Sequence, residues 1–589
     1  MIKKLVCEVD CGGSRGIAFD ETITLLPGQT AVFKPGARSC WYGHGFAHRQ
    51  PYPLNAEEIV SGDFAVNNIQ CPVWLNSNGF VVAARTRGKI SASLSGGVLK
   101  VTNKSESPDA TGAFEINVLT GDTLTEANKK FLKNAGWPNA APDTKKFLGD
   151  SVFCSWTQYP RRINQRRVLQ MAGEIRRNAY PCSVITIDDA WESRYGELSF
   201  NKSDFPDPAG MVAELSKMGF RTLLWATPFI DEGASTFSEL SEKKFLVMRR
   251  GSDEAARLKW WGGTAGLVDL TNPRAREWYK ERLLGLVNDF GVAGFKIDGG
   301  DAKYLPGGAD TAWHLGVGPS GYADALLSVF EEIAPGMCET RTAWDSQRRN
   351  IVWRQGGKDS HFGLDNGLAA LVSLGLHMSL LGYDIFMPDM VPGRVQTMRE
   401  DDPLPTDELL VRWAEASAFF PVMQFSYFPW NYSMETAEVV RGFALMHKEL
   451  EEYLGRESKD RTAPLVRPLW YGNEGAPNVQ ALYSVPDMFA LGPSVIAAPV
   501  VGERRVSRDV ALPPGRWRDI WSGETLNGGF YAAYPAPCPG APVYVCESEP
   551  ELYVRLADSA AKIKTGTIKP GVTTSSYFAG VDRDLSVTG

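Results

Sequence analysis

Charged side chains recur at the ends of short apolar segments in the middle of this chain of 589 residues. Asp188 and Asp189 end one segment, and Lys296 and Asp298 lie at the end of another. Because alternate residues of a strand point to the same side, Lys296 and Asp298 are expected to form an ion pair. A lone carboxylate at a strand end is often only a helix cap, the role predicted for Asp207. Several carboxylates at neighbouring strand ends instead indicate an active site.

The residue types around these carboxylates limit the reactions that the site could catalyse. With six His, nine Cys and no CxxC pair, neither a metal site nor a disulfide framework is expected, and no cofactor is predicted. The chain has 17 Trp, 19 Tyr and 28 Phe, which suits stacking on sugar rings, although a large core explains these numbers equally well. Two carboxyl groups in an aromatic cleft with Arg and Lys nearby predict glycoside hydrolysis. In that reaction one carboxylate attacks or activates water, and the other protonates the departing oxygen.

The elements that must position these groups alternate between strands and helices. Strands are predicted at 152–156, 183–189, 221–227, 293–298, 337–342, 351–355, 381–386 and 422–428. Helical patterns at 165–178, 210–218, 274–290, 366–380 and 406–419 separate most of them. The count and the length predict a parallel (β/α)₈ TIM barrel, whose catalytic groups project from the C-terminal ends of the strands. A doubly wound open sheet is the alternative, but no Gly-rich phosphate fingerprint follows the first strand.

The segments on either side of this central part have a different hydrophobic pattern. Residues 1–122 alternate over short stretches broken by turns, which predicts an N-terminal β-sandwich, and a linker follows at 123–147. The barrel is assigned to 148–460 and a C-terminal β-sandwich domain to 461–560. Residues 561–589 form a polar tail whose order the sequence leaves open. The predicted fold class is therefore multidomain α/β.

Charge and hydropathy exclude several classes of partner. The net charge of −7 and the absence of a basic block exclude nucleic-acid binding. No apolar run is long enough to cross a bilayer, so no membrane partner is expected. Residues 1–10 lack the pattern of a signal peptide, which predicts a cytoplasmic protein, or a periplasmic or secreted one if a leader has been removed. The predicted partner is an oligosaccharide or glycoside substrate, and a homo-oligomer is compatible with the sequence.

Several ordered motifs resemble glycoside hydrolase family 31. They are IDDAWESRYGELSFNKSDFPDP at 187–208, LWATPFI at 224–230 and GFKIDGGD at 294–301, followed by DMFALG at 487–492, AAPV at 497–500 and LPPGRW at 512–517. The likeness covers roughly residues 60 to 555. Within the family, FKID, WWG at 260–262, LVDLTNP at 267–273, Tyr383-Asp384 and Pro388-Asp389 are similar to the branch of the myogenesis-regulating glycosidase and bacterial α-galactosidases.

The resemblance implies a role for each candidate residue. Asp298 corresponds to the nucleophile and Asp359 to the general acid/base, with Asp365 as the competitor for that second role. The expected substrate-binding residues are Asp188, Asp189, Trp225, Trp261, Lys296, Arg341 and Arg354. Asp188 and Asp189 would hold hydroxyls of the terminal sugar, and Arg341 would bind hydroxyls near the cleavage point. Arg354 either contacts the sugar or pairs with Asp359.

The implied activity is that of a retaining, exo-acting α-glycosidase. Family α-glucosidases have a His-Asp pair where this chain has Pro388 and Asp389, which disfavours α-glucosidase activity. α-Galactosidase activity is expected, with an α-glucosidase or α-xylosidase of the same family as the alternative. A transglycosylase would use the same residues with a different acceptor. A catalytically dead carbohydrate-binding protein is the alternative outside the enzymes, and the presence of Asp298 and Asp359 argues against it.

Overall fold

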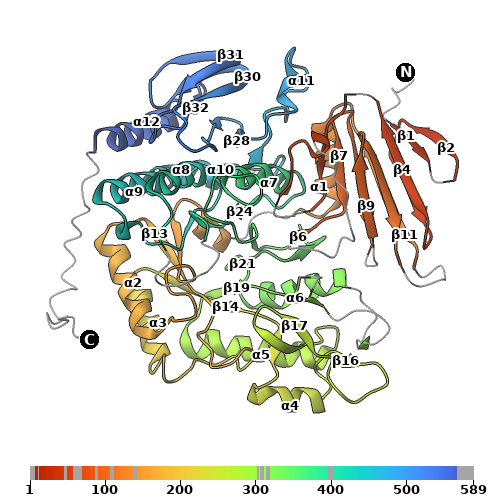
Figure 1. The fold of residues 1–589 in the computed structure, drawn as a ribbon, viewed down its shortest axis with the longest axis vertical. Helices are drawn as coiled ribbons and strands as arrows, with labels where there is room; N and C mark the ends of the chain where they lie inside the picture. The colour runs from red at the N-terminus through yellow and green to blue at the C-terminus, as the bar shows by residue number, and fades with distance from the viewer. Residues whose placement is uncertain are drawn as a thin grey trace.

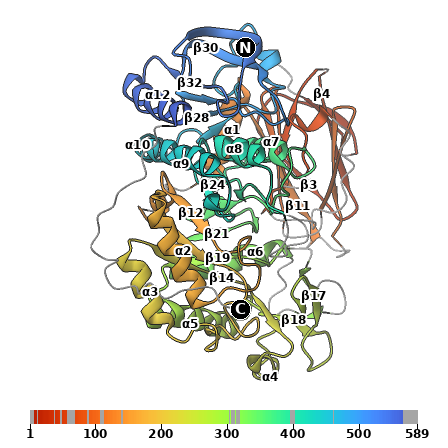
Figure 2. The same cartoon turned by 60° about the vertical axis from the view of Figure 1, so that its left-hand side comes forward.

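The computed structural model describes residues 7–10, 12–36, 38–45, 49–56, 69–86, 90–105, 112–137, 142–301, 304–305, 311–312, 319–394, 403–459 and 461–566. Figures 1 and 2 show three parts, with the N-terminal strands on the right and the C-terminal strands at the top of a central barrel. None of the described helices combines the length and the apolar character that crossing a membrane requires.

The N-terminal strands form two antiparallel five-stranded sheets. The first has the order β2 (Ser14–Ile17), β1 (Cys7–Asp10), β4 (Thr30–Pro35), β10 (Val98–Asn103) and β9 (Ile90–Ser95). The second has the order β3 (Glu21–Leu25), β11 (Phe114–Thr120), β8 (Phe80–Arg85), β7 (Val73–Asn76) and β5 (Trp41–Gly43). Alternate side chains of both sheets, among them Phe33, Leu99 and Ile116, share one buried core. The predicted sandwich is therefore present.

The central strands form the predicted parallel barrel. Its sheet runs through β24 (Phe386–Met387), β23 (Val352–Arg354), β21 (Cys338–Thr340), β19 (Gly294–Ile297), β14 (Arg221–Ala226), β13 (Cys182–Ile187), β12 (Ser151–Cys154), β26 (Gln424–Phe425) and β25 (Met390–Val391). The surrounding helices are α2 (Gln165–Arg177), α3 (Pro208–Lys217), α5 (Pro273–Phe290), α6 (Pro319–Ile333), α7 (Leu368–Leu380) and α8 (Asp407–Ser417). As predicted, Asp207 caps α3, because its side chain accepts a hydrogen bond from the Gly210 amide.

The seventh barrel strand differs from the prediction. Residues 381–385 are not in a strand, and a short pair of strands follows instead: β24 pairs with β23, and β25 pairs with β26. Pro388 and Asp389 separate the two, and Asp389 has a φ of 78°, outside the extended region. One broken segment therefore closes the barrel between its sixth and eighth strands.

Smaller elements extend the barrel loops. After β14, an antiparallel sheet contains β15 (Phe229–Asp231), β18 (Gly263–Leu267) and β17 (Leu258–Trp260), with α4 (Ser235–Glu242) beside it. Two short ladders join β16 (Met248–Arg249) to β20 (Thr311–Ala312) and β6 (Ile69–Gln70) to β22 (Ala343–Trp344). The second ladder ties the N-terminal part of the chain to the loop after β21.

The C-terminal strands form one six-stranded antiparallel sheet in the described part of the chain. Its order is β27 (Val466–Arg467), β28 (Phe489–Leu491), β29 (Val495–Ala497), β32 (Val543–Cys546), β30 (Ser507–Asp519) and β31 (Thr525–Pro535). The remaining helices are α1 (Leu124–Asn134), α9 (Met434–Glu449), α10 (Glu451–Glu457), α11 (Val479–Leu482) and α12 (Pro550–Thr565). Helix α12 extends into the predicted tail, and residues 567–589 lie outside the described residues.

Helix α7 joins the three parts of the molecule. Almost all of its side chains are buried, which is expected of a helix that is apolar on every face. It packs against β5 of the sandwich and against β27 of the C-terminal sheet. The Gly43 amide donates a hydrogen bond of 3.0 Å to Nδ1 of His377 on this helix. Through this helix the barrel therefore contacts both the sandwich and the C-terminal sheet.

Candidate active site

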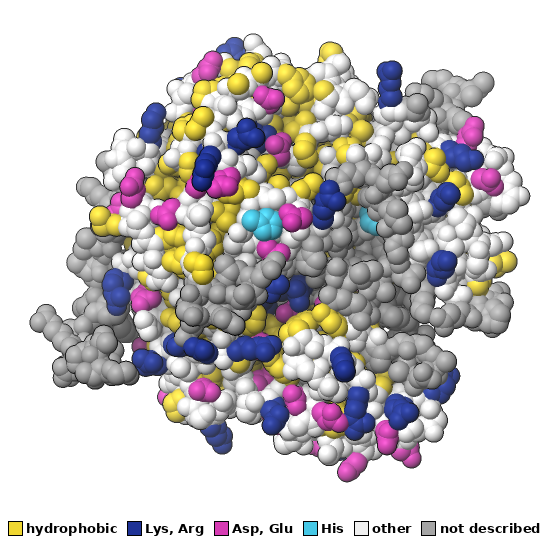
Figure 3. All heavy atoms as spheres, in the orientation of Figure 1, with side chains coloured by type: hydrophobic (Ala, Val, Ile, Leu, Met, Phe, Trp, Pro, Cys, Tyr) yellow, Lys and Arg dark blue, Asp and Glu magenta, His cyan; other side chains and the backbone are white. Residues whose placement is uncertain are grey.

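The predicted site residues meet at the C-terminal ends of the barrel strands. Asp188 and Asp189 follow β13, Trp225 lies at the end of β14, and Asp298 follows β19. Arg341 follows β21, and Arg354 ends β23. In parallel strands these ends share one edge, so the side chains converge although they are far apart in sequence. Figure 3 shows a hollow near the middle of one face, in which acidic and basic side chains are visible.

Asp298 is the carboxylate at the centre of this arrangement. Arg341 Nε donates a hydrogen bond of 2.6 Å to its Oδ1, and Trp225 Nε1 donates one of 3.1 Å to its Oδ2. Burial alone would raise its pKa, but the charges of Arg341, Arg354 and Lys296 outweigh burial and lower the pKa to about 2. With 14% of its side chain exposed, Asp298 is an ionised carboxylate that a ligand can reach.

Lys296 has a different partner from the predicted one. Its Nζ donates a hydrogen bond of 2.7 Å to Asp188 Oδ2, and both side chains are buried. The thiol of Cys154 also donates to this oxygen, over 3.1 Å. Strand alternation correctly placed Lys296 and Asp298 on the inner side of the barrel. It could not indicate that Asp188, which follows β13, lies closer to the ammonium group than Asp298 does.

Arg354 lies between three carboxylates and is not paired with Asp359. Its guanidinium nitrogens are 3.8 Å from Asp298 Oδ1, 3.6 Å from Glu339 Oε2 and 3.7 Å from Asp389 Oδ1. These separations exceed hydrogen-bond length, and neither Nε nor Nη2 has a hydrogen-bond partner among the described residues. Both oxygens of the buried Glu339 also lack one. The predicted pairing with Asp359 is therefore wrong, and Arg354 balances buried negative charge beside Asp298.

Asp189 is a buried carboxylate with one oxygen available. Its Oδ2 accepts hydrogen bonds from Tyr195 Oη at 3.0 Å and from Arg161 Nε at 3.3 Å. No hydrogen bond to Oδ1 is present within the described part of the chain. Burial raises the pKa of Asp189 to about 6, with Asp188 adding to the rise and Tyr195 and Arg161 opposing it. Asp189 therefore changes charge near neutral pH.

The two candidates for the second catalytic carboxyl differ in exposure. Asp359 has 19% of its side chain exposed, and its Oδ2 accepts a hydrogen bond of 2.9 Å from Asn366 Nδ2. Its Oδ1 is 4.0 Å from Arg394 Nε. Asp365 is 75% exposed, and its Oδ1 lies 3.8 Å from Nδ1 of His361, which itself accepts a hydrogen bond from the Gly363 amide. The environment of Asp359 is thus the more ordered of the two, and the more easily shielded from water.

An aromatic cluster flanks the carboxylates on the side of β14 and the loop that follows it. The rings of Trp225 and Trp260 are stacked with centroids 6.5 Å apart, and Trp261 packs against Trp260 at 4.8 Å. The Arg341 guanidinium lies 5.3 Å from the centre of the Trp261 ring. Trp225 and Trp261 are thus both within reach of the residues that surround Asp298.

Sequence reasoning missed several residues of this site. Cys154 and Arg161 contact the predicted Asp residues but lie in no motif, and Tyr195 lies in the 187–208 motif without being singled out; their other signal is that each follows or ends a barrel strand. Asp384, which lies beside Tyr383 in a family motif, is not part of this site. Its carboxylate instead accepts hydrogen bonds from Trp137 and Arg461, so it joins the linker to the C-terminal part.

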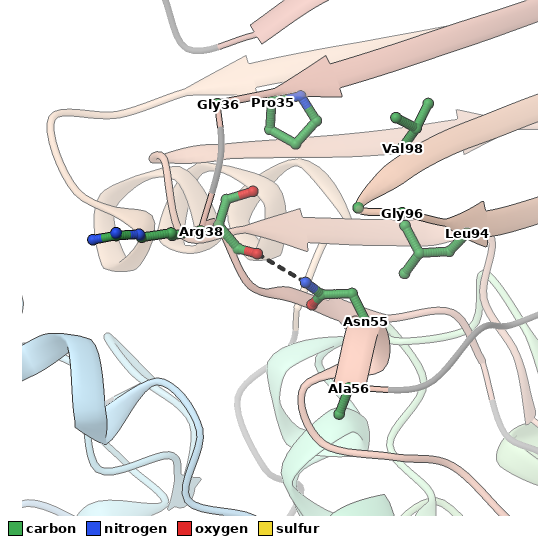
Figure 4. Close-up of a pocket in the computed structure, with 10 residues that line it drawn as sticks. Pro35, Gly36, Arg38, Asn55, Ala56, Leu94, Gly96 and Val98 are labelled. Atoms are coloured by element: carbon green, nitrogen blue, oxygen red, sulfur yellow. Dashed lines mark hydrogen bonds between the residues drawn. The ribbon is translucent and has the colours of Figure 1, made fainter.

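Two further features bear on what this molecule could bind. A cavity of about 430 Å³ in the N-terminal sandwich is lined mainly by Gly and apolar residues, among them Leu94 and Val98, and its one charged lining residue, Arg38, points away from Asn55 and Leu94 (Figure 4). It holds none of the carboxylates described above. Among the described residues, no group of three His, Cys, Asp or Glu side chains is arranged to hold a metal ion.

Comparisons with known proteins agree with this geometry. Residues 148–455 match the sequence model of the glycosyl hydrolases family 31 TIM-barrel domain, and residues 462–549 match the family 31 C-terminal domain. The chain is 30% identical over 541 residues to the myogenesis-regulating glycosidase of Mus musculus, covering 87% of this chain and 75% of that protein. It is 28% identical to a 1,3-alpha-isomaltosidase of Kribbella flavida, covering 58% of this chain but only 50% of that protein.

Solved structures give the same fold. A GH31 alpha-xylosidase from a soil metagenome, complexed with xylose, has a TM-score of 0.76 at 22% identity and covers 92% of this chain and 83% of its own. The Flavobacterium johnsoniae GH31 dextranase complexed with glucose has a TM-score of 0.76 at 20% identity, over 89% of this chain and 67% of its own.

At the C-terminal ends of its strands, the barrel holds an ionised, accessible carboxylate beside stacked aromatic rings. This is the arrangement expected of a glycoside hydrolase. The matched residues show which family of that class is present. The chain belongs to glycoside hydrolase family 31, and the predicted likeness to the branch of the myogenesis-regulating glycosidase is confirmed.

Proposed function

We propose that this chain is a retaining, exo-acting α-glycosidase that releases terminal α-linked galactose. The observation that carries the proposal is the state of Asp298, which Arg341, Arg354 and Lys296 keep ionised at neutral pH. A carboxylate that attacks an anomeric carbon must be unprotonated, reachable and held in one orientation. The hydrogen bonds from Arg341 and Trp225 supply that orientation.

In the proposed reaction Asp298 and Asp359 act on opposite ends of the breaking bond. An Asp298 oxygen forms a bond to the anomeric carbon while the glycosidic bond breaks, and Asp359 gives its proton to the departing oxygen. Asp359 then takes a proton from water as that water attacks the same carbon, which frees Asp298 and retains the anomeric configuration. The partial shielding of Asp359, compared with the exposed Asp365, supports its selection for this role.

Unpaired polar atoms around Asp298 support the binding of a single terminal sugar. Asp189 Oδ1, Asp389 Oδ1 and Arg354 Nη2 are buried and have no hydrogen-bond partner among the described residues. Buried polar atoms normally have partners, so hydroxyl groups of a substrate are natural occupants. Asp188 is different, because Lys296, Cys154 and the Asp189 amide already bind its oxygens. Asp188 and Lys296 are therefore proposed to shape the pocket floor.

The proposed preference for galactose depends on Pro388. A family α-glucosidase has a His there, whereas Pro388 offers no side-chain donor and precedes the inward-pointing Asp389. Galactose has an axial hydroxyl at C4, and a site that pairs its buried groups with that hydroxyl leaves them unpaired when glucose binds. We expect kcat/KM for an aryl α-galactoside to exceed that for the aryl α-glucoside by at least ~100-fold, about 2.7 kcal/mol.

A panel of aryl α-galactoside, α-glucoside, α-xyloside and α-N-acetylgalactosaminide measures this preference directly. A galactoside-to-glucoside ratio near one, or below one, would reject the galactosidase proposal and leave the family assignment unchanged. A dominant α-xyloside activity would favour the alternative that the solved α-xylosidase structure represents.

The pH dependence of kcat/KM tests the role of Asp189. This carboxyl is ionised above its pKa of about 6 and protonated below it. If it accepts a hydrogen bond from a sugar hydroxyl, kcat/KM should fall as the pH drops through about 6. The nucleophile cannot cause this fall, because the pKa of Asp298 is about 2. Asp189→Asn should lower kcat/KM and remove the acid limb; an unchanged limb in this variant would assign it to another group.

A further inference from the structure

The break in the seventh barrel strand places one buried carboxylate in an unusual position. Asp389 lies between β24 and β25, is fully buried and has a φ of 78°. Non-glycine residues seldom adopt this backbone conformation unless the surrounding contacts impose it. A regular strand would send residue 389 in another direction. The break therefore determines where the Asp389 carboxylate points.

The two oxygens of Asp389 face two different parts of the site. Oδ2 accepts a hydrogen bond of 2.7 Å from the backbone amide of Lys358, the residue before Asp359. Oδ1 is 3.7 Å from Arg354 Nη1, and Nη2 of the same guanidinium is 3.8 Å from Asp298 Oδ1. A single side chain thus links the loop that carries Asp359 to the cation beside Asp298.

The residues after Asp389 hold the same loop from the other side. The Arg394 amide donates to the Lys358 carbonyl, and the Ser360 amide donates to the Arg394 carbonyl, each at 3.0 Å. Gly393 has a φ of 84°, and a Cβ built there would lie 3.1 Å from the backbone of Asp359. Residues 389–394 and 358–360 therefore pack closely, backbone against backbone.

We propose that Asp389 is a positioning residue, which holds the Asp359 loop in register with Arg354 and Asp298. This inference rests on the proposed role of Asp359 as the acid/base. Asp389 acts through its hydrogen bond to the Lys358 amide, and through the negative charge that it sets against Arg354. Its loss should displace the proton donor more than it disturbs the nucleophile, because Arg341 and Trp225 hold Asp298 independently.

Two substitutions separate these contributions. Asp389→Asn keeps an oxygen that can accept from the Lys358 amide but removes the charge. Asp389→Ala removes both. A displaced acid matters most when the leaving group needs a proton, so Asp389→Ala should lose ~100-fold more kcat/KM on a phenyl glycoside than on a dinitrophenyl glycoside. Asp389→Asn should recover most of this difference, which a role confined to stabilising the fold would not explain.

The experiment compares aryl glycosides of graded leaving-group pKa across Asp389→Ala, Asp389→Asn, Asp359→Ala and the Asp359→Ala/Asp389→Ala pair. In the double variant, removing Asp389 should add little leaving-group dependence, because the donor that it positions is already gone. Asp384→Asn is the matched control: another buried Asp of the same segment, bound to Trp137 and Arg461 away from Asp298. This variant should change kcat/KM by the same factor for every leaving group.

The outcomes distinguish this inference from the proposed function. If the loss of kcat/KM in Asp359→Ala depends on the leaving group, but Asp389→Ala lowers kcat/KM by the same factor for every substrate, the positioning role is rejected and the acid/base assignment stands. The positioning role is also rejected if Asp389→Ala adds its full leaving-group dependence to kcat/KM in a protein that already carries Asp359→Ala. If Asp359→Ala itself shows no leaving-group dependence, the acid/base assignment has failed first.

Discussion

Asp298→Asn is expected to lower turnover by roughly 10⁴-fold or more, about 5.4 kcal/mol at 1.36 kcal/mol per tenfold. Asn has nearly the shape of Asp, and its amide oxygen can still accept the hydrogen bond from Arg341. It is a poor nucleophile, so the covalent glycosyl-enzyme cannot form. Steady-state kinetics with an aryl glycoside, together with circular dichroism to check the fold, measures the effect.

The Asp298→Gly variant provides the matched test of the same role. Removing the side chain leaves room beside Arg341 and Trp225, and external azide or formate is expected to restore turnover of an activated substrate. Activity within a few fold of wild type in Asp298→Asn would refute the nucleophile assignment. Because Arg341 loses its carboxylate partner and Arg354 loses one of three nearby carboxylates, some loss of thermal stability is expected in both variants, and it does not count against the assignment.

Asp359→Ala is expected to affect substrates unequally. An acidic aryl leaving group departs without being protonated. The glycosylation step should therefore slow far less with an activated aryl glycoside than with a natural disaccharide. We expect the two losses in kcat/KM to differ by ~100-fold or more, at the lower end of what general acid catalysis contributes. Pre-steady-state kinetics isolates the glycosylation step.

Asp365→Ala is the control for this prediction. Its side chain is 75% exposed and lies in the same loop, so its loss should leave the leaving-group dependence unchanged. A larger effect from Asp365→Ala, or equal losses on both substrates in Asp359→Ala, would move the acid/base role away from Asp359.

The barrel and the position of Asp298, the proposed nucleophile, could be predicted because both depend on local patterns. Apolar strands that alternate with amphipathic helices define a parallel barrel, and polar residues that end such strands must lie at one edge. Asp298 follows the fully buried strand β19, so its place at that edge required no knowledge of other contacts. Three of the family motifs, at 187–208, 224–230 and 294–301, start in or span the barrel strands β13, β14 and β19 and could be recognised for the same reason.

Partners within the site could not be predicted in this way. The spacing of Lys296 and Asp298 indicates a shared side of the barrel, but the ammonium group binds Asp188, 108 positions away in the chain. The pairing of Arg354 with Asp298, Glu339 and Asp389 likewise depends on which strands are neighbours. Electrostatic attraction depends on distances in space, and the register between strands sets those distances.

For the seventh strand of the barrel, the local sequence pattern was insufficient and the tertiary structure was needed. Residues 381–386, which are mostly apolar but include Asp384, are compatible with the end of a helix and with a strand, and local pattern favours neither. Only closure of the barrel requires β24 to pair with β23 and β25 to pair with β26, with Asp389 turned inward between them. The sequence by itself determined the barrel and the edge at which Asp188, Asp189 and Asp298 lie, because periodicity and residue type are local. The tertiary structure alone decided which charges meet, because hydrogen bonds between strands that are distant in sequence bring them together.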